Sequence, residues 1–406
     1  MSRQLLLVIA YHFPPDAAIG GARPFRFYKY MKRLGYECHV LTAAPQKEPS
    51  ADIEYVPDPL RVRPKEGWAW QAERVAWKFL LRSDLRLSWA DAVFRRGQEI
   101  LSAWRGDSVT VLSSAPPAGT HFAALRLARH SGYPWIADFR DPIHHKTGNP
   151  APLQSIVEPL VERTILQQAD FVLANTDAMR DSWSRLYRLL SPGSLDKVHV
   201  LWNGFDPEDA ILPEPLPARE RKVLSHVGEL YGGRNLRPIF DAFAGLMARG
   251  DLSSTSIRIR QVGDAEASEL PDENAMREAL AAGWLELRGV VPPAEARALA
   301  LESDGLLLIQ PNTGTQVPAK TYEYLRMGRP ILAFVVKESP VERILQMAGV
   351  PFQCVYPEQT GEEMVRSVKL YLAMLDGSIG KPNSWFEQTF SAPRQAAQLH
   401  GLIQSL

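Results

Sequence analysis

Short apolar runs alternate with helical patterns along almost the whole chain, and this alternation limits the fold more than any other feature. The run QLLLVIA is followed by the helical stretch PFRFYKYMKRLG, which ends at Gly35, and then by the run ECHVLTA. Four further runs of the same kind are SVTVLSS, PWIADF, DFVLANT and KVHVLW. Strands separated by helices are typical of parallel βαβ units, so we expect an α/β, doubly wound fold.

A change in amino-acid composition and periodicity after Trp202 indicates a second domain. The stretch NGFDPEDAILPEPLPARERK is rich in proline and acidic residues and has no periodicity, as in a linker. A second series follows, with the apolar runs KVLSHVG, SIRIRQVG, WLELRG, GLLLIQP and PILAFVV and the helical stretch NLRPIFDAFAGLMARG. Because 406 residues exceed one ordinary core, we expect two Rossmann-like domains, at 1–204 and 205–383, that face a central cleft. Ligands of such sheets lie beyond the carboxyl ends of the strands.

Composition excludes several classes of protein. Apolar residues make up 45% and charged residues 23% of the chain, as in soluble globular proteins. The formal net charge is zero, which argues against a nucleic-acid-binding protein. The apolar run Leu5–Ala10 is too short to span a bilayer and lacks the surroundings of a signal peptide, so we expect a cytoplasmic location. The two cysteines, Cys38 and Cys354, are predicted to be buried thiols rather than a disulfide or a zinc site.

The loop after the first strand contains two adjacent glycines, Gly20 and Gly21, immediately before a helix. Glycines at this point let the backbone approach a ligand, and a helix N-terminus attracts an anion, although the pair could also serve an ordinary turn. The loop lacks G-x-G-x-x-G, and the second strand does not end in an acidic residue. No G-x-x-x-x-G-K-[ST] motif is present either. NAD-dependent oxidoreductases and P-loop NTPases are therefore disfavoured.

The second series offers cations at two comparable positions. In HVGELYGGRN, Arg234 follows a strand and a glycine-containing loop and precedes a helix, where it can bind phosphate oxygens. In QVPAKTYEYLRMGRPILA, Pro318 begins a helix, Lys320 supplies a point charge, and Glu323 can accept hydrogen bonds from vicinal hydroxyls such as those of a ribose. Alternatively, Glu323 pairs with Lys320 or Arg326 on a solvated face.

The order and spacing of six motifs resemble the retaining GT-B glycosyltransferases of glycosyltransferase family 4, over nearly the whole chain. These motifs are FPP...GGARPFRF, PWIADFRDP, ADFVLANTDAM, VLWNGFDP, HVGELYGGRN and VPAKTYEYLRMGRPILA. The resemblance implies two Rossmann-like domains, with the acceptor on the N-terminal domain and the nucleotide-sugar donor on the C-terminal one. The final stretch, 384–406, is similar to the helix with which the family crosses back onto the N-terminal domain.

The resemblance also assigns roles to individual residues. Arg234 and Lys320 would hold the donor diphosphate, Glu323 the ribose, and Gly20 and Gly21 the region where the donor phosphate meets the acceptor. The remaining donor-side residues would be Gly228, Thr315, Gln316 and Val317.

Two departures from the family pattern affect the sugar and acceptor sides. Many members have two glutamates separated by seven residues, and Thr315 stands where the first would be. The histidine that often follows the strand PWIADF is replaced by Arg140 and Asp141.

Transfer from a nucleotide-sugar requires stabilisation of the departing diphosphate, and Arg234, Lys320 and loop amides suit that task without a metal or other cofactor. The chain contains no D-x-D triplet, a common metal-binding signature. The resemblance implies retention without a protein nucleophile. Asp141 is our candidate for orienting or deprotonating the acceptor hydroxyl. The other acceptor-side candidates are His12, His121, Asp138 and Arg140. Asp138 and Arg140 could instead form an internal ion pair.

Residues 60–105 hold five of the ten tryptophans among many arginines. Basic residues recur every fourth position, and tryptophans gather beside them, as in helices that bind anionic lipid. The basic positions are Arg74, Lys78, Arg82 and Arg86. Core packing or a lid over the acceptor would explain the segment equally well.

These observations predict a hexosyltransferase-type enzyme that transfers a sugar from a nucleotide-sugar to a glycan or lipid-linked acceptor, in bacterial-type surface polysaccharide or glycolipid synthesis. A peripheral position on the inner face of the membrane would fit the segment 60–105. Two alternatives remain at this point. One is a nucleotide-sugar epimerase or hydrolase, and the other is a non-catalytic protein that binds nucleotide-sugars.

Overall fold

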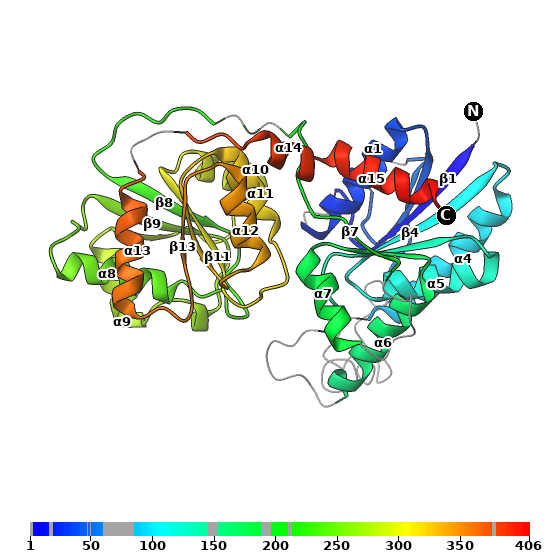
Figure 1. The fold of residues 1–406 in the computed structure, drawn as a ribbon, viewed down its shortest axis with the longest axis horizontal. Coiled ribbons are helices and arrows are strands. Elements are labelled where there is room, and N and C mark those ends of the chain that lie inside the picture. Colours follow the sequence, from blue (N-terminus) through cyan, green and yellow to red (C-terminus); the bar gives the residue numbers. More distant parts are fainter. Residues whose placement is uncertain are drawn as a thin grey trace. The chain divides into compact units, whose positions relative to one another are not determined.

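The computed structural model divides the chain into two compact units (Figure 1). Unit 1 comprises Met1–Asp206 together with Phe390–Leu406, and unit 2 comprises Pro207–Thr389. The chain thus leaves unit 1 at Asp206 rather than at 204, and returns at Phe390 rather than at 384. The structure describes residues 3–15, 19–46, 48, 50–59, 85–144, 153–187, 196–209, 211, 213–375 and 379–406.

Unit 1 is built on a seven-stranded parallel sheet in the order β3-β2-β1-β4-β5-β6-β7. The sequence order of these strands reverses between β1 and β4, as in doubly wound folds. The strands are β1 (Gln4–Ala10), β2 (Glu37–Thr42), β3 (Ile53–Tyr55), β4 (Ser108–Ala115), β5 (Trp135–Phe139), β6 (Phe171–Ala174) and β7 (Val198–Val200).

Both faces of this sheet are covered, because successive side chains of β1 enter two different cores. Leu5, Leu7 and Ile9 pack in one core, whereas Leu6 and Val8 pack in the other. The first core takes side chains from α4 (Leu87–Ala103), α5 (Gly119–Ser131), α6 (Gln154–Gln168) and α7 (Asp177–Leu186). The second is covered by α1 (Ala22–Arg33) and α15 (Ala392–Gln404), which lie beside each other (Figure 1).

Unit 2 repeats this plan with a six-stranded parallel sheet in the order β10-β9-β8-β11-β12-β13. Its strands are β8 (Lys222–Val227), β9 (Ile257–Val262), β10 (Leu285–Leu287), β11 (Gly305–Gln310), β12 (Ile331–Val335) and β13 (Phe352–Val355). Its α-helices are α8 (Arg237–Ala248), α9 (Glu273–Ala281), α10 (Pro293–Leu301), α11 (Ala319–Met327), α12 (Pro340–Ala348), α13 (Gly361–Leu372) and α14 (Ser384–Phe390).

Every strand predicted from the apolar runs is present, and two edge strands were missed. β3 and β13 are short and contain Glu54 and Gln353, so neither has the continuous apolar pattern of a central strand. The two cysteines are buried free thiols, as predicted, and burial raises the pKa of each to about 12. Among the described residues, no helix has the length and apolar character needed to cross a membrane.

The closing segment is two helices rather than one. α14 ends at Phe390, and α15 begins at Ala392, with Pro393 in its first turn. Ser391 between them forms a β-bridge with Phe205, whose N–H donates to Phe390 O (3.1 Å). The return of the chain to unit 1 is therefore fixed by backbone hydrogen bonds next to the point of departure.

Candidate functional site

The predicted donor residues of unit 2 gather where β8 ends. Gly228 follows β8 with φ +142°, and a Cβ added there would lie 2.1 Å from Lys320 Nζ. Gly263 follows the neighbouring strand β9 with φ +115°, and its added Cβ would lie 2.8 Å from the carbonyl of Gly228. Both positions require glycine, because left-handed backbone and close contact coincide. Lys320, from the first turn of α11, occupies the space that Gly228 leaves.

Lys320 is held in this position by His226, the penultimate residue of β8. Lys320 Nζ lies 3.0 Å from His226 Nε2, and His226 Nδ1 lies 2.7 Å from Gln261 Oε1. Gln261 Nε2 in turn donates to Gly228 O (2.9 Å). His226 and Gln261 are almost completely buried. Three side chains therefore form one continuous line of hydrogen bonds beneath the glycine loop.

The charge of Lys320 is strongly affected by this environment. Burial, and next the positive field of Arg234, lower the pKa of Lys320 to about 7, while Glu323 and Glu229 act in the opposite direction. Among the described residues, no carboxylate lies within ion-pair distance of Lys320 Nζ. Burial, with Lys320 as a second cause, holds the pKa of His226 well below its usual value, so the imidazole is neutral.

Arg234 is the second cation at this end of the sheet. Its guanidinium stacks on the ring of Tyr231, with Cζ 4.6 Å from the ring centroid. Arg234 Nε is buried and has no hydrogen-bond partner among the residues that the structure describes. The backbone of the preceding loop is fixed separately, because Gly233 N donates to Glu269 Oε1 (2.8 Å) and Asn312 Nδ2 donates to Gly232 O (2.8 Å). Arg234 thus keeps donors for an anion.

The first amides of α11 add to this positive region. Pro318 is the N-cap and contributes no side-chain hydrogen bond to the helix. Tyr324 fixes the helix against the sheet, because its hydroxyl accepts from Val227 N (2.9 Å). Helix N-termini carry partial positive charge, so α11 and the two cations offer complementary groups to an anion.

The loop before α11 contains the other predicted donor residues. Thr315 N donates to Thr313 Oγ1 (3.3 Å), and the two hydroxyls lie 3.2 Å apart. Gln316 and Glu323 are partly buried, whereas Val317 is buried. A turn with hydrogen-bonded hydroxyl groups therefore precedes α11.

Replacing Gly228 with alanine is expected to weaken nucleotide-sugar binding at least tenfold, because the new methyl group displaces Lys320 Nζ. The strained backbone should also cost on the order of 1–3 kcal/mol of unfolding free energy. Gly250→Ala is the matched control, since Gly250 also has positive φ (+72°) but its added Cβ meets nothing within 4 Å. Calorimetric titration and thermal unfolding of both variants measure the two effects. Equal donor affinity in both variants would contradict the prediction.

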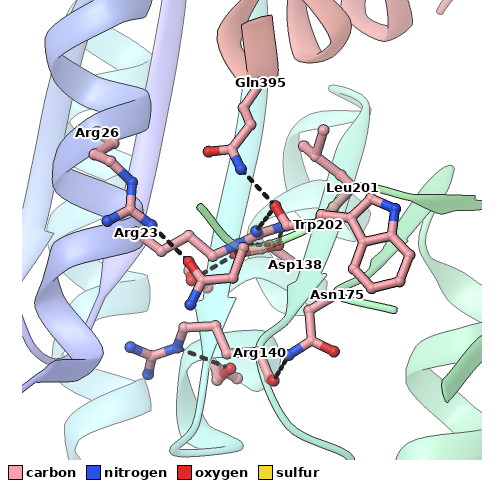
Figure 2. A network of polar contacts seen from close by, with 11 residues as sticks. Arg23, Arg26, Asp138, Arg140, Asn175, Leu201, Trp202 and Gln395 are labelled. Atoms are coloured by element: carbon pink, nitrogen blue, oxygen red, sulfur yellow. Dashed lines mark hydrogen bonds and ion pairs between the residues drawn. The ribbon is translucent and has the colours of Figure 1, made fainter. Parts of the chain in front are cut away.

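In unit 1, the predicted acceptor residue Asp138 is an internal partner of Arg23 (Figure 2). Arg23 Nη2 lies 2.7 Å from Asp138 Oδ1, and Ser114 Oγ donates to Asp138 Oδ2 (2.7 Å). The same guanidinium donates to the carbonyls of Leu201 (2.7 Å) and Trp202 (2.6 Å). Asp138 is 0% exposed, and Arg23 is 3% exposed. The alternative that Asp138 pairs with Arg140 is wrong, because the ion-pair partner of Asp138 is Arg23, which lies on α1.

Arg140 instead lies against the glycine loop. Arg140 Nε donates to Ala115 O (3.1 Å), Nη2 donates to Pro116 O, and Asn175 Nδ2 donates to Arg140 O (Figure 2). A Cβ added to Gly20 would lie 2.5 Å from Arg140 Nη1, which has no hydrogen-bond partner among the described residues. Burial lowers the pKa of Arg140 from its usual value. The structure thus brings Gly20 and Arg140 together. Gly21 is confined by Phe13, whose Cα would lie 3.0 Å from an added Cβ.

The two predicted histidines differ in their surroundings. His121 is completely buried, with its ring centroid 4.5 Å from that of Phe139 and Nδ1 2.8 Å from Ser113 Oγ. Burial lowers the pKa of His121 to about 3, so it is a neutral core residue rather than an acceptor-facing base. His12 is partly buried and packs edge to face on Tyr11, with centroids 5.1 Å apart.

Asp141 is partly buried, and its charge raises the pKa of Arg140 against the larger effect of burial. The loop that follows Asp141 is anchored by Glu162 of α6, whose Oε1 accepts from Ile143 N (2.7 Å). Burial raises the pKa of Glu162 to about 7. Asp141 therefore stays a candidate, on a loop held by a buried carboxyl group.

The basic and tryptophan-rich segment predicted at 60–105 lies partly outside the described residues, which resume at Leu85. Arg74, Lys78 and Arg82 are in the part that is not described. Arg86 pairs with Asp58 (3.0 Å), and Trp89 is buried, with its Nε1 donating to Val56 O (3.0 Å). In the described part, no cluster of three or more His, Cys, Asp or Glu side chains is arranged to hold a metal ion.

Several residues that shape these sites were missed by sequence reasoning. They are His226 and Gln261 in unit 2, and Arg23, Ser114, Glu162 and Asn175 in unit 1. His226 and Gln261 are buried polar residues, each one position before the end of its strand. A polar residue at the carboxyl end of a parallel strand is the signal that would have found them.

Comparisons with known proteins give one family match and several solved structures of similar fold. Residues 25–209 match the family model described as Glycosyltransferase Family 4. No curated protein sequence matches the chain significantly. Sucrose-phosphate synthase from Thermosynechococcus elongatus has a TM-score of 0.66 at 14% identity over 99% of both chains. Anabaena HepE, in complex with UDP-glucose, has a TM-score of 0.61 at 12% identity, over 99% of this chain and 100% of that one.

WaaG, a glycosyltransferase involved in lipopolysaccharide biosynthesis, has a TM-score of 0.58 at 15% identity, over 97% of this chain and 99% of that one. At these identities the likeness of structures defines the fold. The chain has the GT-B fold, with two Rossmann-like domains, as the sequence predicts. The match to Glycosyltransferase Family 4 covers residues 25–209, less than half of the chain, so it is a likeness of the N-terminal part to that family.

Proposed function

We propose that the protein transfers a sugar from a nucleotide-sugar donor to an acceptor hydroxyl. The observation that carries this proposal is the pair of cations in unit 2. Arg234 and Lys320 lie beside the N-terminus of α11, and neither forms an ion pair among the described residues. Two such cations near a helix N-terminus suit a diphosphate, which is the part common to all nucleotide-sugar donors.

The proposed reaction breaks the bond between the anomeric carbon and the donor diphosphate and forms a bond to the acceptor oxygen. Negative charge grows on the diphosphate as it leaves, so Arg234 and Lys320 would stabilise the transition state more than the ground state. These groups would serve without a metal ion. The acceptor hydroxyl loses its proton, and we propose Asp141 as the group that orients or receives it.

We further propose retention of anomeric configuration, a hexose-type donor, and a glycan or lipid-linked acceptor in bacterial-type surface polysaccharide or glycolipid synthesis. WaaG is described as taking part in lipopolysaccharide biosynthesis, and HepE is described in complex with UDP-glucose. These descriptions support the choice of donor and pathway tested first. A cytoplasmic location, peripheral on the inner membrane face, belongs to the same proposal.

One observation favours a second candidate function. Thr315 and Thr313 bond to each other where family members often have a carboxylate for the sugar. A site that lacks this carboxylate could bind the nucleotide half without transferring the sugar, or could release or epimerise it. Incubation with radiolabelled donor, with and without a membrane fraction as acceptor source, separates these activities. Acceptor-dependent product supports transfer, whereas free sugar formed without acceptor supports hydrolysis.

A nucleotide-sugar is expected to raise the thermal stability of the protein. We would screen UDP-, GDP-, ADP- and dTDP-glucose by thermal shift, because a ligand at about 100 times its dissociation constant adds about 2.7 kcal/mol. That amount corresponds to a shift of several degrees for a domain of this size. Free glucose at the same concentrations is the control, since it lacks the diphosphate. No shift with any of the four nucleotides would contradict the proposed donor class.

A further inference from the structure

Lys320 is partly buried, and it is held by a neutral acceptor where such a cation would ordinarily meet a carboxylate. Its Nζ lies 3.0 Å from His226 Nε2, and it forms no ion pair with any of the described residues. A carboxylate partner would keep the lysine permanently charged and would occupy its donors. A neutral nitrogen fixes the position of the amine and leaves its charge to be decided by what else binds.

The tautomer of His226 follows from the residues behind it. Gln261 Nε2 donates to Gly228 O (2.9 Å), and this contact fixes the orientation of the amide group. Gln261 Oε1 must therefore be the atom facing His226 Nδ1 at 2.7 Å, and it accepts the Nδ1 proton. His226 Nε2 is left with a lone pair directed at Lys320 Nζ. In the three hydrogen bonds that connect Lys320 to the Gly228 carbonyl, each side chain therefore donates to the next group: Lys320 to His226, His226 to Gln261, and Gln261 to Gly228 O.

Charged groups face Lys320 from each element around it. Glu229 and Arg234 lie in the loop between β8 and α8, and Glu323 is one turn further along α11. Burial and Arg234 outweigh the two glutamates, so the pKa of Lys320 falls to about 7. A bound diphosphate would add two negative charges beside Lys320 and would raise the pKa of its amine again. Lys320 is therefore placed where a ligand's charge decides its protonation.

We propose that His226, with its tautomer fixed by Gln261, is the positioning residue of Lys320, and that the diphosphate of the donor binds together with one proton taken up by Lys320 Nζ. This inference rests on the proposed function and adds a regulation of the same site. The proton comes from solvent and forms a third N–H bond on Lys320 Nζ, and no other covalent bond changes. The consequence is a donor affinity that falls as the pH rises above neutrality.

The first experiment uses the free protein, so that it does not depend on the donor. Protein labelled with ¹³C and ¹⁵N in lysine and with ¹⁵N in histidine is followed by NMR from pH 5 to 11, and the Lys320 signal is assigned with Lys320→Arg. We expect a midpoint near pH 7, and imidazole ¹⁵N shifts that show the Nδ1–H tautomer of His226. A midpoint near the usual value of about 10.4 would overturn the proposal.

The second experiment counts protons during donor binding. UDP-, GDP-, ADP- and dTDP-glucose are titrated calorimetrically in buffers of different ionisation enthalpy at pH 6 and pH 8. A lysine with a pKa near 7 predicts uptake of about 0.9 proton at pH 8 and about 0.1 at pH 6. The affinity should fall by nearly tenfold per pH unit above pH 7. Lys320→Arg keeps a cation at every pH, so the uptake should disappear.

A matched pair of variants tests the positioning role of His226. The amide of His226→Gln reaches the Nε2 position and can still accept from Lys320, whereas that of His226→Asn reaches only the Nδ1 position. We expect the dissociation constant of the donor to rise about tenfold in His226→Asn, which loses one hydrogen bond to a charged group. In His226→Gln, which keeps that hydrogen bond, we expect a rise of less than about threefold. A purely structural role would lower the melting temperature of both variants and leave their donor affinities equal.

The outcomes distinguish this inference from the function on which it rests. If Lys320 titrates near pH 7 but none of the four nucleotide glucoses binds, the proposed donor class fails, and with it the diphosphate half of the inference. If a donor binds without proton uptake, or if the uptake persists in Lys320→Arg, the function stands and the inference is overturned.

Discussion

Replacing Lys320 with alanine should lower the rate of sugar transfer by about 10²- to 10³-fold, the effect of removing one preorganised donor from a developing negative charge. Lys320 lies beside Arg234 and the N-terminus of α11, so its charge acts where the diphosphate departs. The unfolding free energy should change far less, because within the described part of the chain the side chain of Lys320 forms one hydrogen bond, to His226. Release of nucleoside diphosphate from the best-binding donor measures the rate.

Lys337→Ala is the control for loss of a positive charge from the same unit. Lys337 is exposed just after β12, and this variant should retain the activity of the parent protein. If Lys320→Ala keeps more than half of the parent rate while thermal melting shows an intact fold, Lys320 does not stabilise the leaving group. Unchanged donor affinity together with a reduced rate would locate its effect in the transition state.

Replacing Asp138 with alanine should destabilise unit 1 by about 3–5 kcal/mol, because removal of one partner leaves a buried charge without compensation. Arg23, which is 3% exposed, would lose its carboxylate partner (Figure 2). Ser114 would lose the acceptor of its hydroxyl proton as well. Differential scanning calorimetry of the full chain measures the shift of the unfolding transition.

The surface pair of Arg3 and Glu37 provides the control for this variant. Its atoms are equally close, at 2.7 Å, but the side chains are 56% and 47% exposed, so Glu37→Ala should change the stability little. The double variant Arg23→Met/Asp138→Leu should recover part of the loss, because neither charge then stays buried alone. A loss below about 1 kcal/mol in Asp138→Ala would show that water or a rearranged side chain compensates Arg23.

The sequence allowed more of the fold to be predicted than of the side-chain contacts within the sites. Central strands such as β1 and β11 are continuous apolar runs, so their burial on both faces was visible in the sequence. β13 was not visible, because an edge strand with Gln353 and Cys354 lacks that pattern. The loops with Arg234 and Lys320 were recognised because each follows a strand and precedes a helix.

The pairings within the sites were not predictable in the same way. Lys320 and His226 are 94 positions apart, and Arg23 and Asp138 are 115 positions apart. The sequence offered Arg140 as the nearest cation for Asp138, but partner choice depends on the angle at which α1 meets the sheet. Glu323 was a candidate partner for Lys320 on helical spacing alone, whereas the glycines after β8 and β9 direct the lysine toward His226.

The close meeting of the two chain segments at Phe205 and Ser391 makes unit 2 an inserted domain. Phe205 N donates to Phe390 O (3.1 Å), and Ala392 N donates to Phe205 O (2.9 Å). Gly204 has no space for a side chain, because an added Cβ would lie 1.9 Å from Phe390 O. Both ends of the insertion are therefore adjacent on unit 1. Residues 207–389 can be excised as one uninterrupted gene segment, and a few glycines joining 206 to 390 would reconnect the host domain.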